Sequence, residues 1–181
     1  MNLISHQTRH RIYNTIIGAV LAGVFLPLQS ATAIDERRLD FHHTHTNERI
    51  SVTYRRGEEY LPEGLNDINV FLSDFRNGKS IDIDPHLLDL LYDLREALGS
   101  AGTYEVISAY RSPETNELLR SRSGGVAKNS LHLKGQAIDI RLTDVELSAL
   151  RDTALSMQRG GVGYYSRSNF VHVDTGRVRR W

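Results

Sequence analysis

The chain has 181 residues, 22 basic and 22 acidic side chains, a formal net charge of zero and no cysteine. This balance argues against a nucleic-acid-binding protein, which normally carries a strong basic excess. The absence of cysteine excludes disulfide bonds and a lipidated cysteine anchor, so the stability of an exported protein of this kind must come from its core or from a metal ion.

The first 33 residues have the pattern of a secretory signal peptide. Arg9 and Arg11 give a basic start, an apolar run of 13 residues extends from Ile16 to Leu28, and Ala31-Thr32-Ala33 is a small-x-small cleavage site. The run is short and contains a proline, which argues against a membrane-spanning helix, although an uncleaved anchor is the alternative. Cleavage would leave 34–181 as a single soluble domain with 20 basic and 22 acidic residues.

A β-hairpin is predicted at the start of this domain. Residues Leu39 to His45 and Ile50 to Tyr54 read as strands, separated by a turn at Thr46-Asn47-Glu48. The first strand contains three histidines, of which His43 and His45 would share one face. A second metal site there is one interpretation, but no carboxylate has ligand spacing beside the pair, so a polar strand face is favoured.

Two helices are expected next. Apolar residues at helical spacing run from Leu65 to Phe75, after a loop over Tyr60 to Gly64. Asp84 is a favourable N-cap and Pro85 suits the first helical position. The helix that they open ends near Gly99, and its apolar stripe consists of Leu87, Leu88, Leu91, Leu94 and Leu98.

The middle of the chain predicts a strand, a helix and a loop. Thr103 to Ala109 form the strand, and Ser112-Pro113 open a helix with Leu118-Leu119 on its inner side. Arg111 then stands at a strand end, where a substrate-binding side chain and an ordinary surface arginine are equally expected. The basic, glycine-containing residues 120–128 form either a mobile flap or an ordinary loop.

The C-terminal part predicts three strands and one helix. A strand over Gln136 to Leu142 is followed by Thr143-Asp144-Val145-Glu146, which has the pattern of a capping box. The helix would end at Gly160-Gly161 and would bury Leu147, Leu150, Ala154 and Met157. The last strands are expected over Gly161–Tyr165 and Asn169–Asp174. All of these elements together predict an α+β fold, a single domain with a mainly antiparallel sheet and flanking helices.

Two short stretches carry the candidate chemistry. Ser130 to Ile140 delivers His132 from a loop and Asp139 from a strand, and the late stretch Asn169 to Gly176 contains His172. Two imidazoles and one carboxylate suit one catalytic zinc ion and leave a coordination position free. From the spacing alone, packed histidines and a turn-capping aspartate remain the alternative, because the pattern is not a regular metal-binding motif.

The combined motifs resemble the LAS group of zinc metallopeptidases and, more closely, the murein endopeptidase MepK family. The resemblance covers nearly the whole chain and rests on Ser130-x-His132-x-x-Gly135-x-Ala137-x-Asp139 together with Ser108–Pro113, Asn129–His132 and Phe170–Gly176. It implies a LAS/hedgehog-like metallopeptidase fold and a periplasmic zinc endopeptidase of cell-wall growth and remodelling. The implied substrates are diaminopimelate–diaminopimelate and D-Ala–diaminopimelate cross-links between peptidoglycan stem peptides.

By the same resemblance His132, Asp139 and His172 are the zinc ligands. Arg111 is expected to bind substrate and to stabilise the developing oxyanion. Tyr110 and Ser130 are expected to contribute to substrate binding. Two other functions remain open: a D,D- or L,D-carboxypeptidase that trims stem peptides, and a peptidoglycan-binding module without catalysis.

One departure from the wider group concerns the general base. Many LAS enzymes place a glutamate three residues, or a histidine two residues, before the last ligand, whereas this chain has Asn169 and Phe170 there. Asp174 shares a strand face with His172 and is therefore the expected base. The alternative is that Asp174 only holds a ligand histidine in place.

Overall fold

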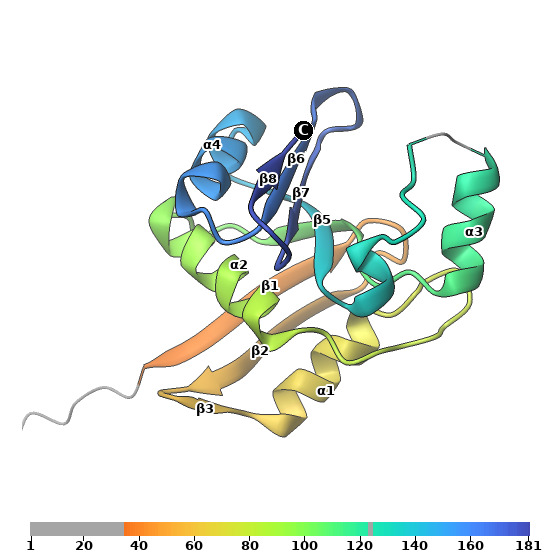
Figure 1. Ribbon diagram of the computed structural model, residues 1–181. Coiled ribbons are helices and arrows are strands. Elements are labelled where there is room, and N and C mark those ends of the chain that lie inside the picture. Colours follow the sequence, from red (N-terminus) through yellow and green to blue (C-terminus); the bar gives the residue numbers. More distant parts are fainter. Residues whose placement is uncertain (1–34, 123–124) are drawn as a thin grey trace, which may run out of the picture. The chain divides into compact units, whose positions relative to one another are not determined.

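The computed structural model describes residues 35–122 and 125–181, so the predicted signal peptide lies outside the described residues. Within these ranges one eight-stranded sheet is combined with four α-helices and two short 3-10 helices (Figure 1). No helix of the described ranges has the length and apolar character needed to cross a membrane. The strands are β1 (Glu36–His43), β2 (Arg49–Arg56), β3 (Glu59–Tyr60), β4 (Tyr104–Ser108), β5 (Ala137–Leu142), β6 (Gly161–Tyr165), β7 (Phe170–Asp174) and β8 (Arg179–Arg180). The helices are α1 (Pro62–Phe71), α2 (Pro85–Ala97), α3 (Pro113–Arg122), η1 (Leu131–Lys134), α4 (Leu147–Met157) and η2 (Ser166–Ser168).

The strand order is β3-β2-β1-β4-β5-β7-β6-β8. Only β1–β4 and β6–β8 pair in parallel among these strands, and the other neighbours are antiparallel. The predicted α+β class with a mainly antiparallel sheet is therefore confirmed, as is the β1–β2 hairpin. The two-residue strands β3 and β8 were not predicted, because so short a segment carries no alternation of polar and apolar residues.

One face of the sheet packs against helices, and the other carries the candidate functional side chains. Side chains alternate along a strand, so β5 directs Ile138 and Ile140 to one face and Asp139 to the other. The face with the isoleucines continues through Phe41 and Val171, and helices α1, α2 and α4 pack on that side. The opposite face is free of these helices and carries the functional side chains.

Helix α2 is tied to the sheet by a buried carboxylate as well as by its leucines. Asp89 is 5% exposed and accepts hydrogen bonds from Tyr54 (2.9 Å), Tyr60 (2.6 Å), Arg55 (3.0 Å) and Arg37 (3.2 Å). These donors come from β1, β2 and β3. The sequence prediction missed this role because an aspartate within a leucine-rich helix usually marks its solvated side.

The predicted limits of α1 are wrong. The helix runs from Pro62 to Phe71 and not from Leu65 to Phe75, because Pro62 occupies a first-turn position where its missing N–H costs nothing. After the helix the chain folds into a loop in which the backbone carbonyl of Asp74 accepts from Asn77 and Gly78. Phe75 therefore belongs to this loop.

The expected inner face of α3 and the capping box before α4 are also wrong. Leu118 is 42% exposed, and α3 packs through Thr115 and Asn116 instead. Thr143 does not cap α4, because its hydroxyl accepts from the Thr103 N–H at 3.1 Å and the residue before the helix is Glu146. Helix α4 starts at Leu147 without a side-chain cap and ends at Met157, before the predicted glycine pair.

The histidines near β1 do not form a metal cluster. Strand β1 ends at His43, so His45 lies in the following turn and the two do not share a strand face as predicted. The His45 ring instead stacks on Phe75 with ring centroids 4.4 Å apart. Within the described residues, the His132, Asp139 and His172 group is the one set of three or more such side chains close enough to share a metal ion.

Candidate metal centre and cavity

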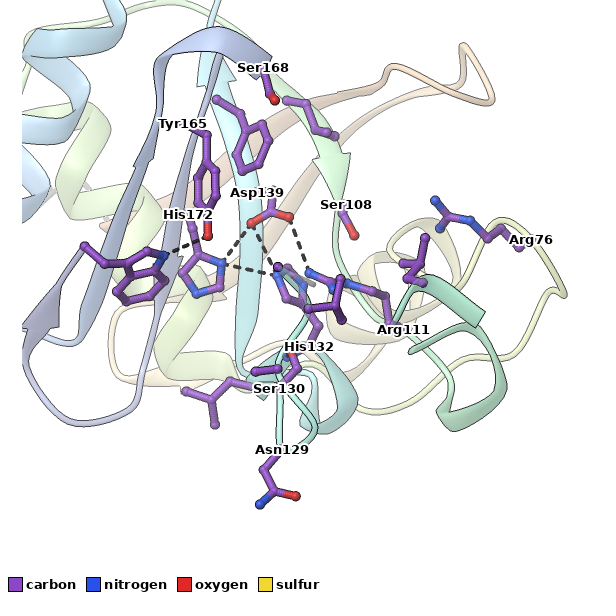
Figure 2. Close-up of a pocket in the computed structure, with 18 of the residues that line it drawn as sticks. Arg76, Ser108, Arg111, Asn129, Ser130, His132, Asp139, Tyr165, Ser168 and His172 are labelled. Atoms are coloured by element: carbon purple, nitrogen blue, oxygen red, sulfur yellow. Dashed lines mark hydrogen bonds and ion pairs between the residues drawn. The ribbon is translucent and has the colours of Figure 1, made fainter. Parts of the chain in front are cut away.

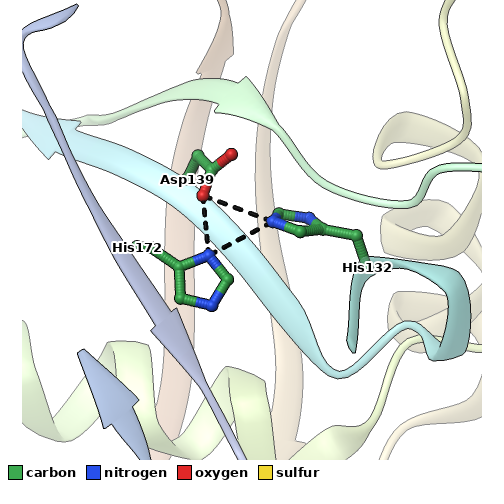
Figure 3. Close-up of side chains that lie close together, drawn as sticks. All are labelled: His132, Asp139 and His172. Carbon is green, nitrogen blue, oxygen red and sulfur yellow. Dashed lines mark hydrogen bonds and ion pairs between the residues drawn. The ribbon is translucent and has the colours of Figure 1, made fainter. Parts of the chain in front are cut away.

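Three side chains from separate elements converge on the face of the sheet opposite α1, α2 and α4 (Figure 3). The Asp139 Oδ1 atom lies 2.8 Å from His172 Nδ1 and 3.3 Å from His132 Nε2, and the two nitrogens are 3.2 Å apart. Ligand atoms of a tetrahedral zinc site are separated by about 3.3 Å when each bond is about 2.0–2.1 Å long. The spacing of this His–Asp–His cluster therefore fits one zinc ion.

Local geometry places His132 accurately. Ser130 accepts a hydrogen bond from the His132 N–H at 3.4 Å and so caps η1. Gly135 ends this short helix with φ +65°, and a Cβ atom there would lie 2.6 Å from the Asp82 carbonyl oxygen, so only glycine fits. The sequence Ser130 to Gly135 thus forms a tight turn that delivers the imidazole to the start of β5.

In each histidine, the ring nitrogen that points away from Asp139 has a partner that can only accept a hydrogen bond. His132 Nδ1 lies 2.6 Å from the Ala109 carbonyl oxygen, and His172 Nε2 lies 3.0 Å from Asp174 Oδ2. Each of these nitrogens must carry the proton, which leaves lone pairs on His132 Nε2 and His172 Nδ1. Both lone pairs face Asp139, and this donor set suits a cation between them.

The ionisation of Asp139 and of His132 also suits a cation. Burial alone would raise the pKa of Asp139, but His132 and His172 hold that pKa far below its usual value. Burial lowers the pKa of His132, so this ring favours the neutral form that binds metals. The pKa of His172 is raised despite its burial, because the Asp139 and Asp174 carboxylates bond to it.

Asp174 is completely buried and all of its acceptor sites are occupied. Besides His172, it accepts from the backbone N–H groups of Gly161 (3.0 Å) and Gly176 (2.9 Å), and it forms an ion pair with Arg179 at 2.6 Å. Asp174 also does not line the cavity beside the cluster. This geometry matches a residue that orients His172, which was the alternative to the predicted general base.

The cluster opens into a cavity of about 580 Å³ (Figure 2). Arg111 lines it, with one guanidinium nitrogen 3.5 Å from Asp139 Oδ2 and 12% of its side chain exposed. Its Nε atom is buried without a hydrogen-bond partner among the described residues. Burial lowers the pKa of Arg111 while Asp139 acts in the opposite direction. A desolvated cation with free donors beside the cluster is suited to bind a substrate oxygen.

The two other predicted substrate-binding residues differ in position. Ser130 lines the cavity next to His132, as Figure 2 shows. Tyr110 is only 9% exposed, belongs to the core and is absent from the cavity lining. Its backbone N–H donates to the Leu72 carbonyl at 3.2 Å, so Tyr110 supports the segment that carries Arg111, and its predicted contact with substrate stays a prediction.

Tyr165 and Trp181 also line the cavity, and the sequence analysis missed both. The Trp181 indole N–H donates to the Tyr165 hydroxyl at 2.7 Å, and the indole ring lies 5.2 Å from the His172 ring. Gly163 leaves room for this arrangement, because a Cβ atom there would lie 2.7 Å from the indole. No motif signals these residues: Tyr165 reaches the site because β6 pairs with β7, and Trp181 because β8 pairs with β6.

Comparisons with known proteins identify the family of this chain. A sequence model of the family described as peptidoglycan L,D-endopeptidase MepK matches residues 31–181. The peptidoglycan L,D-endopeptidase MepK of Escherichia coli strain K12 is 45% identical over 167 residues, which cover 91% of this chain and 92% of that protein. The probable peptidoglycan L,D-endopeptidase MepK of Haemophilus influenzae is 38% identical over 170 residues, covering 91% of each chain. The chain therefore belongs to the MepK family of peptidoglycan endopeptidases.

Proposed function

We propose that this chain is a zinc-dependent endopeptidase that hydrolyses peptide cross-links of peptidoglycan, both diaminopimelate–diaminopimelate and D-Ala–diaminopimelate. The observation that carries the proposal is the convergence of two imidazoles and one carboxylate beside Arg111 in an open cavity. In each imidazole one nitrogen donates to a neighbouring acceptor and the other faces the cluster. The signal-like N-terminus supports a periplasmic location, where peptidoglycan is the available substrate.

His132 Nε2, Asp139 and His172 Nδ1 would hold the zinc ion. A bound zinc ion supplies a Lewis acid and activates water near neutral pH, as amide hydrolysis requires. Arg111 binds the carbonyl oxygen of the scissile amide and stabilises the negative charge that develops on it. The Tyr165 hydroxyl accepts from Trp181, so its own proton is free for donation to the substrate from the other side of the cluster (Figure 2).

Asp174 acts as a positioning residue in this proposal. Its contacts with His172 and Arg179 hold the imidazole so that Nδ1 points at Asp139. Because none of its oxygens reaches the cavity, Asp174 does not exchange protons with substrate. Asp139 is the one carboxylate among the described residues that line the cavity, and the proposal reserves it for the metal ion.

The test is digestion of purified muropeptide dimers of both link types by the zinc-loaded protein, with products identified by mass spectrometry. Monomers are expected from the dimers, activity is expected to disappear with a chelator, and added zinc is expected to restore it. Monomeric tetrapeptide and pentapeptide substrates are included, because loss of a terminal residue without dimer cleavage would indicate a carboxypeptidase. Binding of dimers without chelator-sensitive cleavage would indicate a binding module.

A further inference from the structure

A second group of side chains lies at the far end of the same cavity from His172. Arg76 and His45 both line it, and both pack on Phe75: the Arg76 guanidinium carbon is 4.1 Å from the Phe75 ring centroid and the His45 ring centroid is 4.4 Å from it. In Figure 2, Arg76 lies on the other side of Arg111 from His172. None of these three residues has a role in the proposed chemistry.

Charge distinguishes Arg76 from the other arginines of the cavity. Arg179 is paired with Asp174, and Arg111 is paired with Asp139. Arg76 has no carboxylate within ion-pair distance among the described residues, and its guanidinium lies over the Phe75 ring. The cavity thus contains an exposed guanidinium whose donors are available to an anionic group of a ligand.

The position of Arg76 is nevertheless defined by a buried carboxylate. Asp74 is fully buried, and its side chain accepts from the Arg76 N–H at 3.2 Å and from the Ser112 N–H at 2.9 Å. Asn77 donates to the Ser112 hydroxyl at 2.8 Å, which adds a second link to the same segment. Since Ser112 follows Arg111 directly, this network holds the backbone of Arg76 at a set offset from Arg111.

We propose that His45, Phe75 and Arg76 form a carboxylate subsite that binds the side-chain carboxylate of the residue donating the scissile carbonyl. This proposal rests on the proposed endopeptidase function. In a diaminopimelate–diaminopimelate link, the donor side chain ends in a carboxylate and an ammonium group at the end of a short methylene chain. In a D-Ala–diaminopimelate link, the donor has only a methyl group, whereas the acceptor residue is the same in both links.

The subsite therefore distinguishes the two links by their donor residue. Arg76 pairs with the distant carboxylate while Arg111 and the cluster hold the scissile amide. The Phe75 ring does not line the cavity itself; it packs between the Arg76 guanidinium and the His45 ring and holds both of them at the cavity wall. Binding energy from this remote group favours the diaminopimelate donor.

The test compares Arg76→Ala with wild type on the two purified dimers and on a diaminopimelate–diaminopimelate dimer whose donor side-chain carboxyl is amidated. Arg76→Ala is expected to lower kcat/KM about tenfold on the free-acid dimer, with a change of less than about twofold on the D-Ala–diaminopimelate dimer. Amidation is expected to cause the same loss in wild type and no further loss in the variant. Arg76→Lys is expected to retain part of the preference, because it keeps the charge but not the planar fork.

Lys79→Ala is the matched control. Lys79 lies in the same loop, is exposed, pairs with Glu114 and does not line the cavity, so both rates should stay at the wild-type level. An equal fall in kcat/KM on both dimers, or no fall on either, would overturn the proposal.

A binding experiment tests the subsite independently of catalysis. If the wild-type protein cleaves neither dimer, the endopeptidase function is refuted, and the subsite is then tested by ligand affinity alone. In that arm, a stem tripeptide ending in diaminopimelate should bind wild type about tenfold more tightly than Arg76→Ala, and equal binding would refute the subsite.

Discussion

Asp139 lies directly opposite His172 across the antiparallel β5–β7 pair, with Asp139 Oδ1 2.8 Å from His172 Nδ1. Opposed residues on one face of such a pair have Cβ atoms about 4.5–5.5 Å apart, so strand register alone brings these two ligand candidates together. A slip of one residue would turn His172 into the core. The register is set by the valines on both sides of His172, which must face the helices.

The first prediction concerns metal content. One zinc ion per chain is expected, and His132→Ala or Asp139→Asn should weaken zinc binding by more than about 100-fold, because each removes a direct ligand. Metal analysis after dialysis, with cobalt absorption as a second measure, checks this. His86→Gln changes an exposed histidine away from the site and should retain full zinc. Unchanged zinc content in both ligand variants would refute the assignment.

The second prediction separates the two roles of Asp174. If it positions His172, Asp174→Asn should weaken zinc binding about 10- to 100-fold. It should also destabilise the protein, because Arg179 loses its charged partner. Full zinc content together with a large loss of turnover would instead support a general base. Asp152→Asn is the control, since Asp152 is exposed and pairs only with its neighbour Arg151 among the described residues.

The third prediction concerns Arg111. Arg111→Ala should lower kcat about 10²- to 10³-fold because a preorganised donor to the developing oxyanion is lost. Zinc content should stay unchanged, since the guanidinium contacts Asp139 only at 3.5 Å. Steady-state kinetics with parallel metal analysis measure both quantities. A rise in KM with unchanged kcat would show that Arg111 contributes only to ground-state binding.

A fourth prediction tests the contact between Trp181 and Tyr165. Tyr165→Phe and Trp181→Phe should each lower kcat/KM about fivefold or more. The first variant removes the Tyr165 hydroxyl, and the second removes the indole N–H that donates to this hydroxyl. The double variant should lose little beyond the single ones, since both changes break the same hydrogen bond. Tyr164→Phe, which lies in β6 and stacks under Arg151, should have wild-type activity. Fully additive losses would contradict this coupling.

The fifth prediction is the pH dependence of stability that arises from Asp89. Burial by itself raises its pKa, but hydrogen bonds from Tyr60, Tyr54 and Arg55 lower it below the usual value. A depressed folded-state pKa stabilises the protein above the unfolded pKa of about 3.9, and that contribution is lost as the pH falls through the folded pKa.

Asp89→Asn should accordingly cost about 2–4 kcal/mol at pH 7, because two arginines lose their buried partner. The difference from wild type should shrink below about pH 4 as Asp89 protonates. Urea unfolding followed by circular dichroism between pH 7 and pH 2.5 measures this difference. A gap that stays constant with pH would contradict the assignment.

The sequence by itself determined the fold class, most elements and the candidate ligands. Alternation of apolar residues marked β5 and β7, and Asp84-Pro85 marked the start of α2 as observed. The motifs around His132, Asp139 and His172 were sufficient for the family, which the comparisons confirm. These features are local in the sequence, and local propensity or a motif can therefore report them.

Only the tertiary structure decided how the rest of the cavity is formed. The Gly161 contact that buries Asp174, the hydrogen bond from Trp181 to Tyr165 and the link from Ser112 to Asp74 that places Arg76 near Arg111 all join separate segments of the chain. The same cause explains the wrong inner face of α3 and the missed role of Asp89, because burial of a polar side chain depends on the donors that other elements bring to it. Spacing along the chain carries no information on such long-range partners, so the donors and charges around the predicted ligands became visible only in three dimensions.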